Sequence, residues 1–246
     1  MAWTGKLPMS PYRLVSLLSL PFLLSCAQPG THSGSLVDLT PAEVKFSYEI
    51  YPTNGQPVGR FYYFPGFYMT INDLKSPPFS TLADAFHNAG YEVVYVQWPT
   101  ITAGNVASDK GLSYLESFQG YILSLNNYLT PVQTTVTGGF SFGGLHAVIA
   151  GNEISAQIVI AHLSVNLVSN LAEFSGIDTS ALDITAQAVP QNFFISCGTD
   201  DYRVYWPETY ALFHANPGFH EYPGLDHETL MPQVVDIINW LSNFNI

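Results

Sequence analysis

Nucleophilic catalysis needs an activated serine, and Ser141 lies in a sequence suited to one. It is the centre of Gly139-Phe140-Ser141-Phe142-Gly143, between a β-branched run at 132–137 and an apolar run at 145–150. A serine at such a strand-to-helix turn has a strained backbone that presents its hydroxyl outward, and the flanking glycines leave room for strand and helix to cross. We therefore expect Ser141 to be a nucleophile. In the alternative interpretation it only caps the helix that follows.

An acid and a base follow this serine along the chain. Asp200 and Asp201 come directly after an apolar run that ends at Cys197, and His227 lies in the turn-rich segment 223–228. His227 would accept the proton of the serine and pass it to the leaving group, while the acid would hold the imidazole in the required tautomer. The order Ser, Asp, His predicts a catalytic triad, with either aspartate as the acid.

Alternating strand and helix patterns predict the scaffold that must position these groups. Extended runs occupy 44–50, 59–64, 91–96, 132–137, 157–161, 193–197 and 218–222, and helical patterns occupy 82–88, 108–129 and 229–243. In the longest helix the apolar positions that share one face are Leu112, Leu115, Phe118, Ile122 and Leu125. The alternation predicts an α/β fold, with a mostly parallel doubly wound sheet and helices on both faces. Loops at the carboxyl ends of its strands would carry the function.

Length and composition limit the classes of protein. With 246 residues, 47% of them hydrophobic and 11% charged, the chain can form one α/β domain with a full core. A net charge of −12 with 7 Lys and Arg excludes nucleic acid as the expected partner. No metal-ligand spacing occurs, so we expect neither a metal nor a cofactor. Cys197 lies in an apolar run and is expected to be buried.

The first residues have the pattern of an export signal. Lys6 and Arg13 precede an apolar run at 14–24, which is too short to span a bilayer. Leu23-Leu24-Ser25-Cys26 resembles the lipobox of bacterial lipoproteins, which implies that 1–25 are removed and that Cys26 carries lipid. Residues 26–42 would then be a tether and 43–246 the folded domain. In the alternative, an ordinary signal peptide is cleaved nearby and Cys26 is incidental.

The resemblance also implies a location. A lipid on Cys26 would anchor the protein to a membrane of the bacterial cell envelope. Ala27, rather than Asp, after the cysteine favours the outer membrane.

From about residue 43 to the end, the chain resembles the α/β-hydrolases. The resemblance rests on the elbow at 139–143, the acid loop at 198–204, the loop that holds His227 and the helix-to-strand step at 89–94. In that family the acid commonly stands three residues after a glycine and three before a valine. Asp201 satisfies both spacings, and Asp200 stays the alternative acid. The thirty or so residues between 161 and 192 are short for an inserted lid, so we expect little or no cap domain.

The resemblance extends to the groups that would stabilise a developing oxyanion. The N–H of Phe142 opens the helix after the serine, where unpaired donors favour negative charge. The family's second donor follows an early strand. Because Pro65-Gly66 occupies the place of the family's His-Gly, the resemblance implies that Phe67 supplies it.

Aromatic residues flank the catalytic loops and predict the kind of substrate. The predicted substrate pocket consists of Tyr68, Phe140, Tyr202 and Trp206. A ring-lined, mainly apolar cleft suits acyl chains or aromatic esters. The sequence thus predicts a lipid-anchored extracytoplasmic serine hydrolase, a carboxylesterase or lipase-like enzyme that cleaves small-molecule esters through an acyl-enzyme. A thioesterase or peptidase with the same triad, and a non-catalytic cell-envelope binding lipoprotein, are the alternatives.

Overall fold

The computed structural model of the chain describes residues 33–34, 46–99, 112–168, 171, 178–188, 192–204, 206–229, 231–244 and 246. The predicted signal peptide and Cys26 lie outside this part. Within it, no helix is long and apolar enough to cross a membrane.

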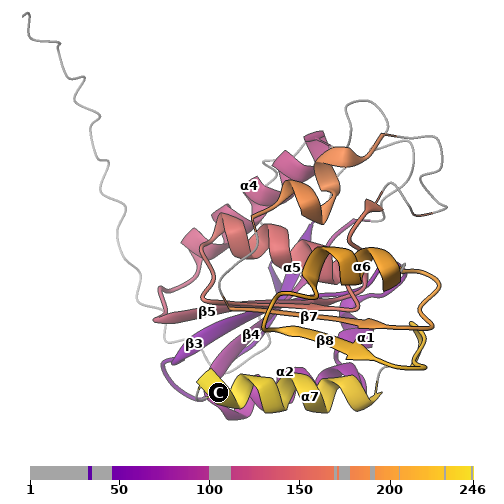
Figure 1. Cartoon of the computed structure of the whole chain (residues 1–246). Coiled ribbons are helices and arrows are strands. Elements are labelled where there is room, and N and C mark those ends of the chain that lie inside the picture. The colour runs from indigo at the N-terminus through magenta and orange to yellow at the C-terminus, as the bar shows by residue number, and fades with distance from the viewer. Residues whose placement is uncertain are drawn as a thin grey trace, which may run out of the picture. The chain divides into compact units, whose positions relative to one another are not determined.

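A twisted sheet forms the centre of the fold (Figure 1). In the described residues it has eight strands: β1 (Ser33–Gly34), β2 (Ser47–Tyr51), β3 (Gly59–Phe64), β4 (Tyr91–Gln97), β5 (Thr134–Phe140), β6 (Ile158–His162), β7 (Phe193–Gly198) and β8 (Phe219–Tyr222). Their order is β1-β2-β4-β3-β5-β6-β7-β8. β2 pairs antiparallel with β1 and β4, and all other pairs are parallel. The predicted mostly parallel sheet is confirmed.

Helices cover both faces of this sheet (Figure 1). They are α1 (Ile71–Leu74), α2 (Phe79–Asn88), α4 (Leu112–Tyr128), α5 (Phe142–Glu153), α6 (Trp206–Phe213) and α7 (Met231–Leu241). One core packs α4 and α5 against the sheet around Phe118 and Val148. The other packs α2 and α7 around Phe86 and Ile237. Strands β3, β6 and β7 are buried along their whole length because they lie between these two cores.

The buried face of α4 differs from the predicted one at its first residue. Leu115, Phe118, Ile122 and Leu125 are buried as expected, whereas Leu112 is 45% exposed. At 3.6 residues per turn, Leu112 points roughly 120° away from the centre of the buried face. Tyr114 and Tyr121 complete that face instead.

The segment between β6 and β7 contains no cap domain in its described part. Its only regular elements there are the 3-10 helices η3 (Ser180–Leu182) and η4 (Ile184–Ala186). The loops at the carboxyl ends of β3, β5, β7 and β8 are therefore not covered by an inserted layer of described residues. This agrees with the prediction of little or no cap.

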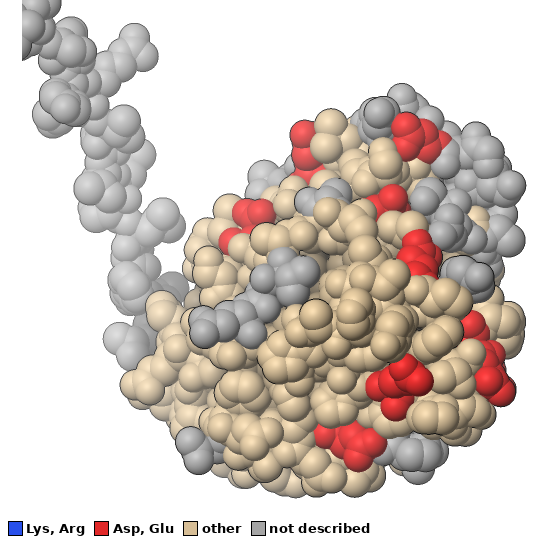
Figure 2. All heavy atoms as spheres, viewed as in Figure 1, with Lys and Arg blue, Asp and Glu red and all other residues tan. Residues whose placement is uncertain are grey.

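Acidic side chains are spread over the face of the molecule shown in Figure 2. The described Lys and Arg residues each contact a carboxylate: Arg60 pairs with Glu92, Lys75 with Glu49, and Arg203 with Glu228. The Arg60 pair is the shortest of the measured contacts that involve an arginine, at 2.7 Å, and its guanidinium is buried. The described surface therefore has no cluster of cations of the kind that binds phosphate backbones.

Candidate active site

Ser141 occupies the sharp turn between β5 and α5. Its backbone angles are φ 56° and ψ −123°, a conformation that costs a non-glycine residue about 1–3 kcal/mol. The Ser141 N–H donates to the carbonyl of His162 at 2.9 Å, which ties the turn to the end of β6. The serine side chain is thereby held at the carboxyl edge of the sheet.

Two glycines make this turn possible. A Cβ on Gly139 would lie 1.9 Å from the carbonyl oxygen of Gly143, and a Cβ on Gly143 would lie 2.2 Å from that of Phe64. Neither position has room for a side chain, because the start of α5 crosses directly over the ends of β5 and β3. Both glycines were expected from the sequence for this reason.

Substitution of Gly143 by alanine is expected to damage the site through the backbone. The added methyl group must displace the end of β3, at an expected cost of about 3 kcal/mol or more in the free energy of unfolding. Any folded fraction should lose about 10²-fold in kcat for an ester, because the loop after β3 would move. Urea denaturation and initial rates measure the two effects.

Gly120 on α4 provides the matched control. Its Cβ would meet no atom within 4 Å, so Gly120→Ala should leave activity unchanged and raise helix stability by about 0.5–1 kcal/mol. A Gly143→Ala protein as stable and active as this control would contradict the close crossing.

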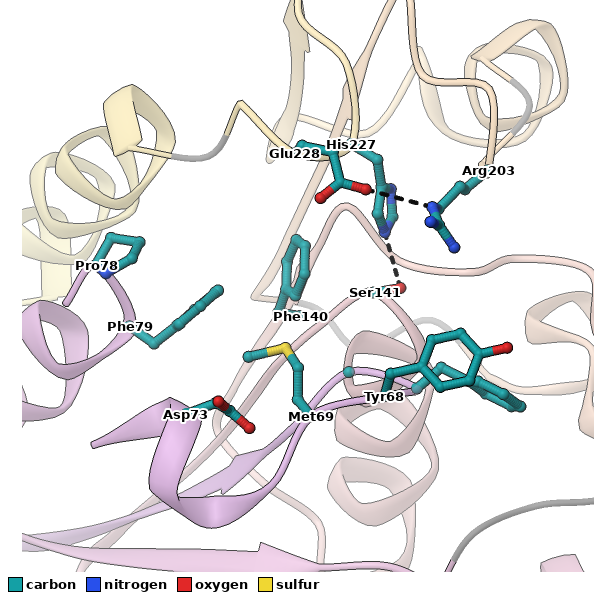
Figure 3. A pocket seen from close by; sticks show the side chains of 12 residues that line it. Tyr68, Met69, Asp73, Pro78, Phe79, Phe140, Ser141, Arg203, His227 and Glu228 are labelled. Carbon is teal, nitrogen blue, oxygen red and sulfur yellow. Dashed lines mark hydrogen bonds and ion pairs between the residues drawn. The ribbon is translucent and has the colours of Figure 1, made fainter. Parts of the chain in front are cut away.

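The predicted acid and base meet the serine in a chain of hydrogen bonds. His227 Nδ1–H donates to Asp201 Oδ2 at 2.7 Å, and the Ser141 hydroxyl donates to His227 Nε2 at 2.9 Å (Figure 3). The second oxygen of Asp201 accepts the N–H groups of Arg203 at 2.9 Å and Val204 at 2.8 Å. Asp201 and His227 are 4% and 5% exposed. The carboxylate therefore fixes both the tautomer and the orientation of the imidazole.

The structure places Asp201, not Asp200, against His227. The Asp200 carboxylate is exposed and lies 3.2 Å from the Thr199 hydroxyl. The loops after β7 and β8 cross closely, since a Cβ on Gly198 would lie 2.1 Å from the carbonyl oxygen of Leu225. Asp226 accepts the N–H groups of Glu228 and Thr229 and shapes the turn around His227.

The two predicted oxyanion donors lie beside the serine. Phe142 is the first residue of α5, and such N–H groups have no carbonyl partner within their helix. Phe67 follows β3, and its ring packs edge-on against that of Phe142, with centroids 5.6 Å apart. Trp98 Nε1–H donates to the carbonyl of Pro65 at 2.9 Å and fixes this loop. No sequence pattern indicates this role for Trp98, because it depends on the position of β4 beside β3.

Ser141 and His227 open into a cavity of about 500 Å³. Its lining residues are Gly66, Phe67, Tyr68, Met69, Asp73, Pro78, Phe79, Phe140, Ser141, Arg203, His227 and Glu228 (Figure 3). The predicted pocket residues Tyr68 and Phe140 are among them, and the Phe140 ring lies 5.2 Å from that of His227. Met69 and Phe79 were missed, because the prediction used aromatic residues beside the catalytic loops: Met69 is not aromatic and Phe79 lies outside those loops.

Two other predicted pocket residues lie elsewhere. Tyr202 is 69% exposed and lines a neighbouring cavity. Trp206 does not line the catalytic cavity. It begins α6, and its ring packs against that of Tyr210 one turn later, at 5.4 Å. The sequence placed both near the acid correctly but could not show which way their rings point.

The other histidines near the site are buried in structural positions. His146 Nδ1–H donates to the carbonyl of Phe142 at 2.9 Å, and the Tyr114 hydroxyl donates to His146 Nε2 at 2.7 Å. Burial lowers the pKa of His146 to about 4. Burial, and secondarily the charge of His227, lowers the pKa of His162 to about 3. Both are neutral near pH 7 and neither contacts Ser141 through its ring, so the structure favours His227 as the base.

These two histidines should make the fold sensitive to acid. The unfolded chain binds protons near pH 6.5 at both sites and the native chain does not, so stability is lost as pH falls from about 6.5 towards 4. Each should contribute about 2 kcal/mol to the loss between pH 7 and pH 5. Urea denaturation at pH 7 and at pH 5 measures this loss in the free energy of unfolding. The loss should be smaller by about 2 kcal/mol in His146→Gln than in wild type. An equal loss in the two proteins would contradict the buried neutral state of His146.

The strand order matches the fold of the α/β serine hydrolases. So do the positions of a strained serine after β5, an aspartate after β7 and a histidine after β8. The chain is similar to a serine hydrolase without lid from Xanthomonas campestris, at a TM-score of 0.56 and 12% identity over 89% of this chain and 96% of that one. It is similar to esterase 2 of Thermogutta terrifontis, at a TM-score of 0.63 and 14% identity over 88% of this chain and 95% of that one. It is also similar to Est1E of Butyrivibrio proteoclasticus, at a TM-score of 0.61 and 12% identity over 87% of this chain and 98% of that one. No protein-family model and no curated protein matches the sequence. At these identities the likeness establishes the fold.

Proposed function

We propose that this protein is a serine hydrolase that cleaves carboxylic esters through an acyl-enzyme on Ser141. The observation that carries the proposal is the hydrogen-bonded chain from Asp201 through His227 to Ser141. A serine that only caps a helix needs no base within 2.9 Å of its hydroxyl. A binding protein needs no buried carboxylate hydrogen-bonded to that base.

The reaction follows from the positions of these groups. His227 Nε2 accepts the hydroxyl proton as Ser141 Oγ attacks the ester carbonyl, and we assign the stabilisation of the oxyanion to the N–H groups of Phe142 and Phe67. Collapse breaks the bond to the alcohol, which leaves with the proton from His227. A water molecule, deprotonated by the same imidazole, then attacks the acyl-enzyme and releases the acid.

The lining of the catalytic cavity supports apolar or aromatic esters as substrates. Met69, Phe79 and Phe140 give it an apolar wall next to the nucleophile. The carboxylates of Asp73 and Glu228 also line it and disfavour anionic substrates. Among proteins with this fold, T. terrifontis esterase 2 has been seen phosphorylated by paraoxon and with propionate bound.

A substrate panel tests the activity and its class. We expect turnover of p-nitrophenyl esters of apolar and aromatic acids, with kcat/KM for the esters exceeding that for matched p-nitroanilides by at least about 10²-fold. Higher kcat/KM for acyl thioesters or amides than for the matched esters would favour a thioesterase or a peptidase. No turnover of any ester would contradict the proposal.

The location forms a separate part of the proposal. The apolar run at 14–24 followed by Cys26 supports export and lipidation, and thus a lipid-anchored enzyme of the bacterial cell envelope, at the outer membrane. Radiolabelled palmitate should enter the wild-type protein in growing cells and be absent from Cys26→Ala. Labelling of both proteins, or of neither, would contradict the anchor.

A further inference from the structure

A second cavity of about 330 Å³ lies next to the catalytic cavity. Its lining residues are Val165, Asn166, Leu167, Tyr202, Arg203, Val204 and Glu208. Arg203 lines both cavities, and the N–H of Val165 donates to the carbonyl of Ser141 at 3.3 Å. A substrate whose carbonyl lies at Ser141 is therefore within reach of both.

The two cavities differ in chemistry. The same guanidinium lines both cavities, and each has at least one carboxylate. The catalytic cavity adds the apolar wall of Met69, Phe79 and Phe140, whereas the second adds an amide. The amide belongs to Asn166, which is 2% exposed and donates to the Thr209 hydroxyl at 2.5 Å. Among the described residues Asn166 Oδ1 has no hydrogen-bond partner, a costly state that favours a ligand or a water with a donor.

Arg203 and Tyr202 form an ordered wall of the second cavity. Arg203 Nε lies 3.3 Å from the Tyr202 hydroxyl and 3.5 Å from Glu228 Oε1. The guanidinium also lies over the Tyr202 ring, 5.4 Å from its centroid. Figure 3 shows Arg203 beside His227, on the side of the cavity opposite Phe79. The Arg203 guanidinium and the Phe79 ring thus lie on different sides of His227.

We propose that the second cavity binds the hydroxyl-rich alcohol half of the ester, a neutral polyol such as a sugar, while the acyl half occupies the apolar wall. This binding role rests on the proposed ester hydrolysis. Hydroxyl groups both donate and accept, so they match a guanidinium, a carboxylate and an amide together. The C–H face of a sugar packs on an exposed aromatic ring such as Tyr202. Arg203 is paired with Glu228, so the carboxylate of Glu208 selects against anionic groups in this cavity.

Two esters of one acid test the inference. Initial rates are measured by pH-stat titration with methyl butyrate and with glucose 6-butyrate. In wild type we expect kcat/KM for the glucose ester to exceed that for the methyl ester by about tenfold. Glu208→Gln, and separately Tyr202→Leu, should lower this ratio to about twofold or less, because the first replaces a charged acceptor by a neutral amide and the second removes the aromatic ring. Tyr202 is largely exposed, so its substitution tests the site without disturbing the core.

The control is Tyr210→Ala, which removes an exposed ring of α6 that lines neither cavity. Its ratio should equal that of wild type. If wild type hydrolyses the methyl ester and its kcat/KM ratio between the two esters is near one, the polyol site is overturned and the proposed esterase activity stands. An unchanged ratio in both Glu208→Gln and Tyr202→Leu would also overturn it. Failure of wild type on both esters would contradict the esterase itself and the polyol site with it.

Discussion

Substitution of Ser141 by alanine is expected to lower kcat for a p-nitrophenyl ester by about 10⁶-fold. Without the hydroxyl, no acyl-enzyme forms, and His227 and Asp201 have no nucleophile to activate. The cavity keeps its shape because the Ser141 side chain is not part of the packing that holds the elbow. Steady-state rates of a protein expressed without contaminating esterases provide the measurement.

Ser76→Ala is the matched control for this substitution. Ser76 is exposed, and its hydroxyl donates only to the carbonyl of Asn72 among the measured contacts. Its kcat should stay within about twofold of wild type, as for most surface changes. Activity of Ser141→Ala above about 1% of wild type would exclude Ser141 as the nucleophile.

The second large effect concerns the acid. Asp201→Asn is expected to lower kcat by about 10⁴-fold, because an amide can donate to Nδ1 and so stabilise the wrong tautomer of His227. Asp200→Asn should change kcat by less than about threefold, since that carboxylate is exposed and bonded to Thr199. The pair is measured with one ester under identical conditions. Equal, modest losses in the two proteins would contradict the assignment of the acid to Asp201.

The parts of the site that the sequence predicted are those that backbone geometry dictates. Ser141 needs a turn with a positive φ and glycines on both sides, and these requirements are visible as a local pattern. The order of acid and histidine is likewise visible, because the acid follows the strongly apolar β7 and the histidine lies in a turn-rich segment after β8. Leu112 shows the limit at helix ends, where the first apolar position of a pattern can fall outside the buried face.

The parts that the sequence could not predict are set by tertiary packing. Met69 and Phe79 reach the cavity only because the loop before α1 and the start of α2 lie next to the elbow. The choice of Asp201 over Asp200 depends on which carboxylate points inward at a two-residue turn, and spacing from the family was needed to favour it. Tyr202 and Trp206 flank the same loop, yet one lines the second cavity and the other packs within α6.

The most direct test of the central claim is mass spectrometry of the protein after reaction with paraoxon. An activated serine attacks the phosphorus, p-nitrophenolate leaves as its P–O bond breaks, and the serine retains a diethyl phosphoryl group. We expect one adduct per chain, on the peptide that contains Ser141. It should be absent in Ser141→Ala and form at least about 10²-fold more slowly in His227→Gln. An unmodified wild-type protein, or an adduct that persists in Ser141→Ala, would contradict Ser141 as the activated nucleophile.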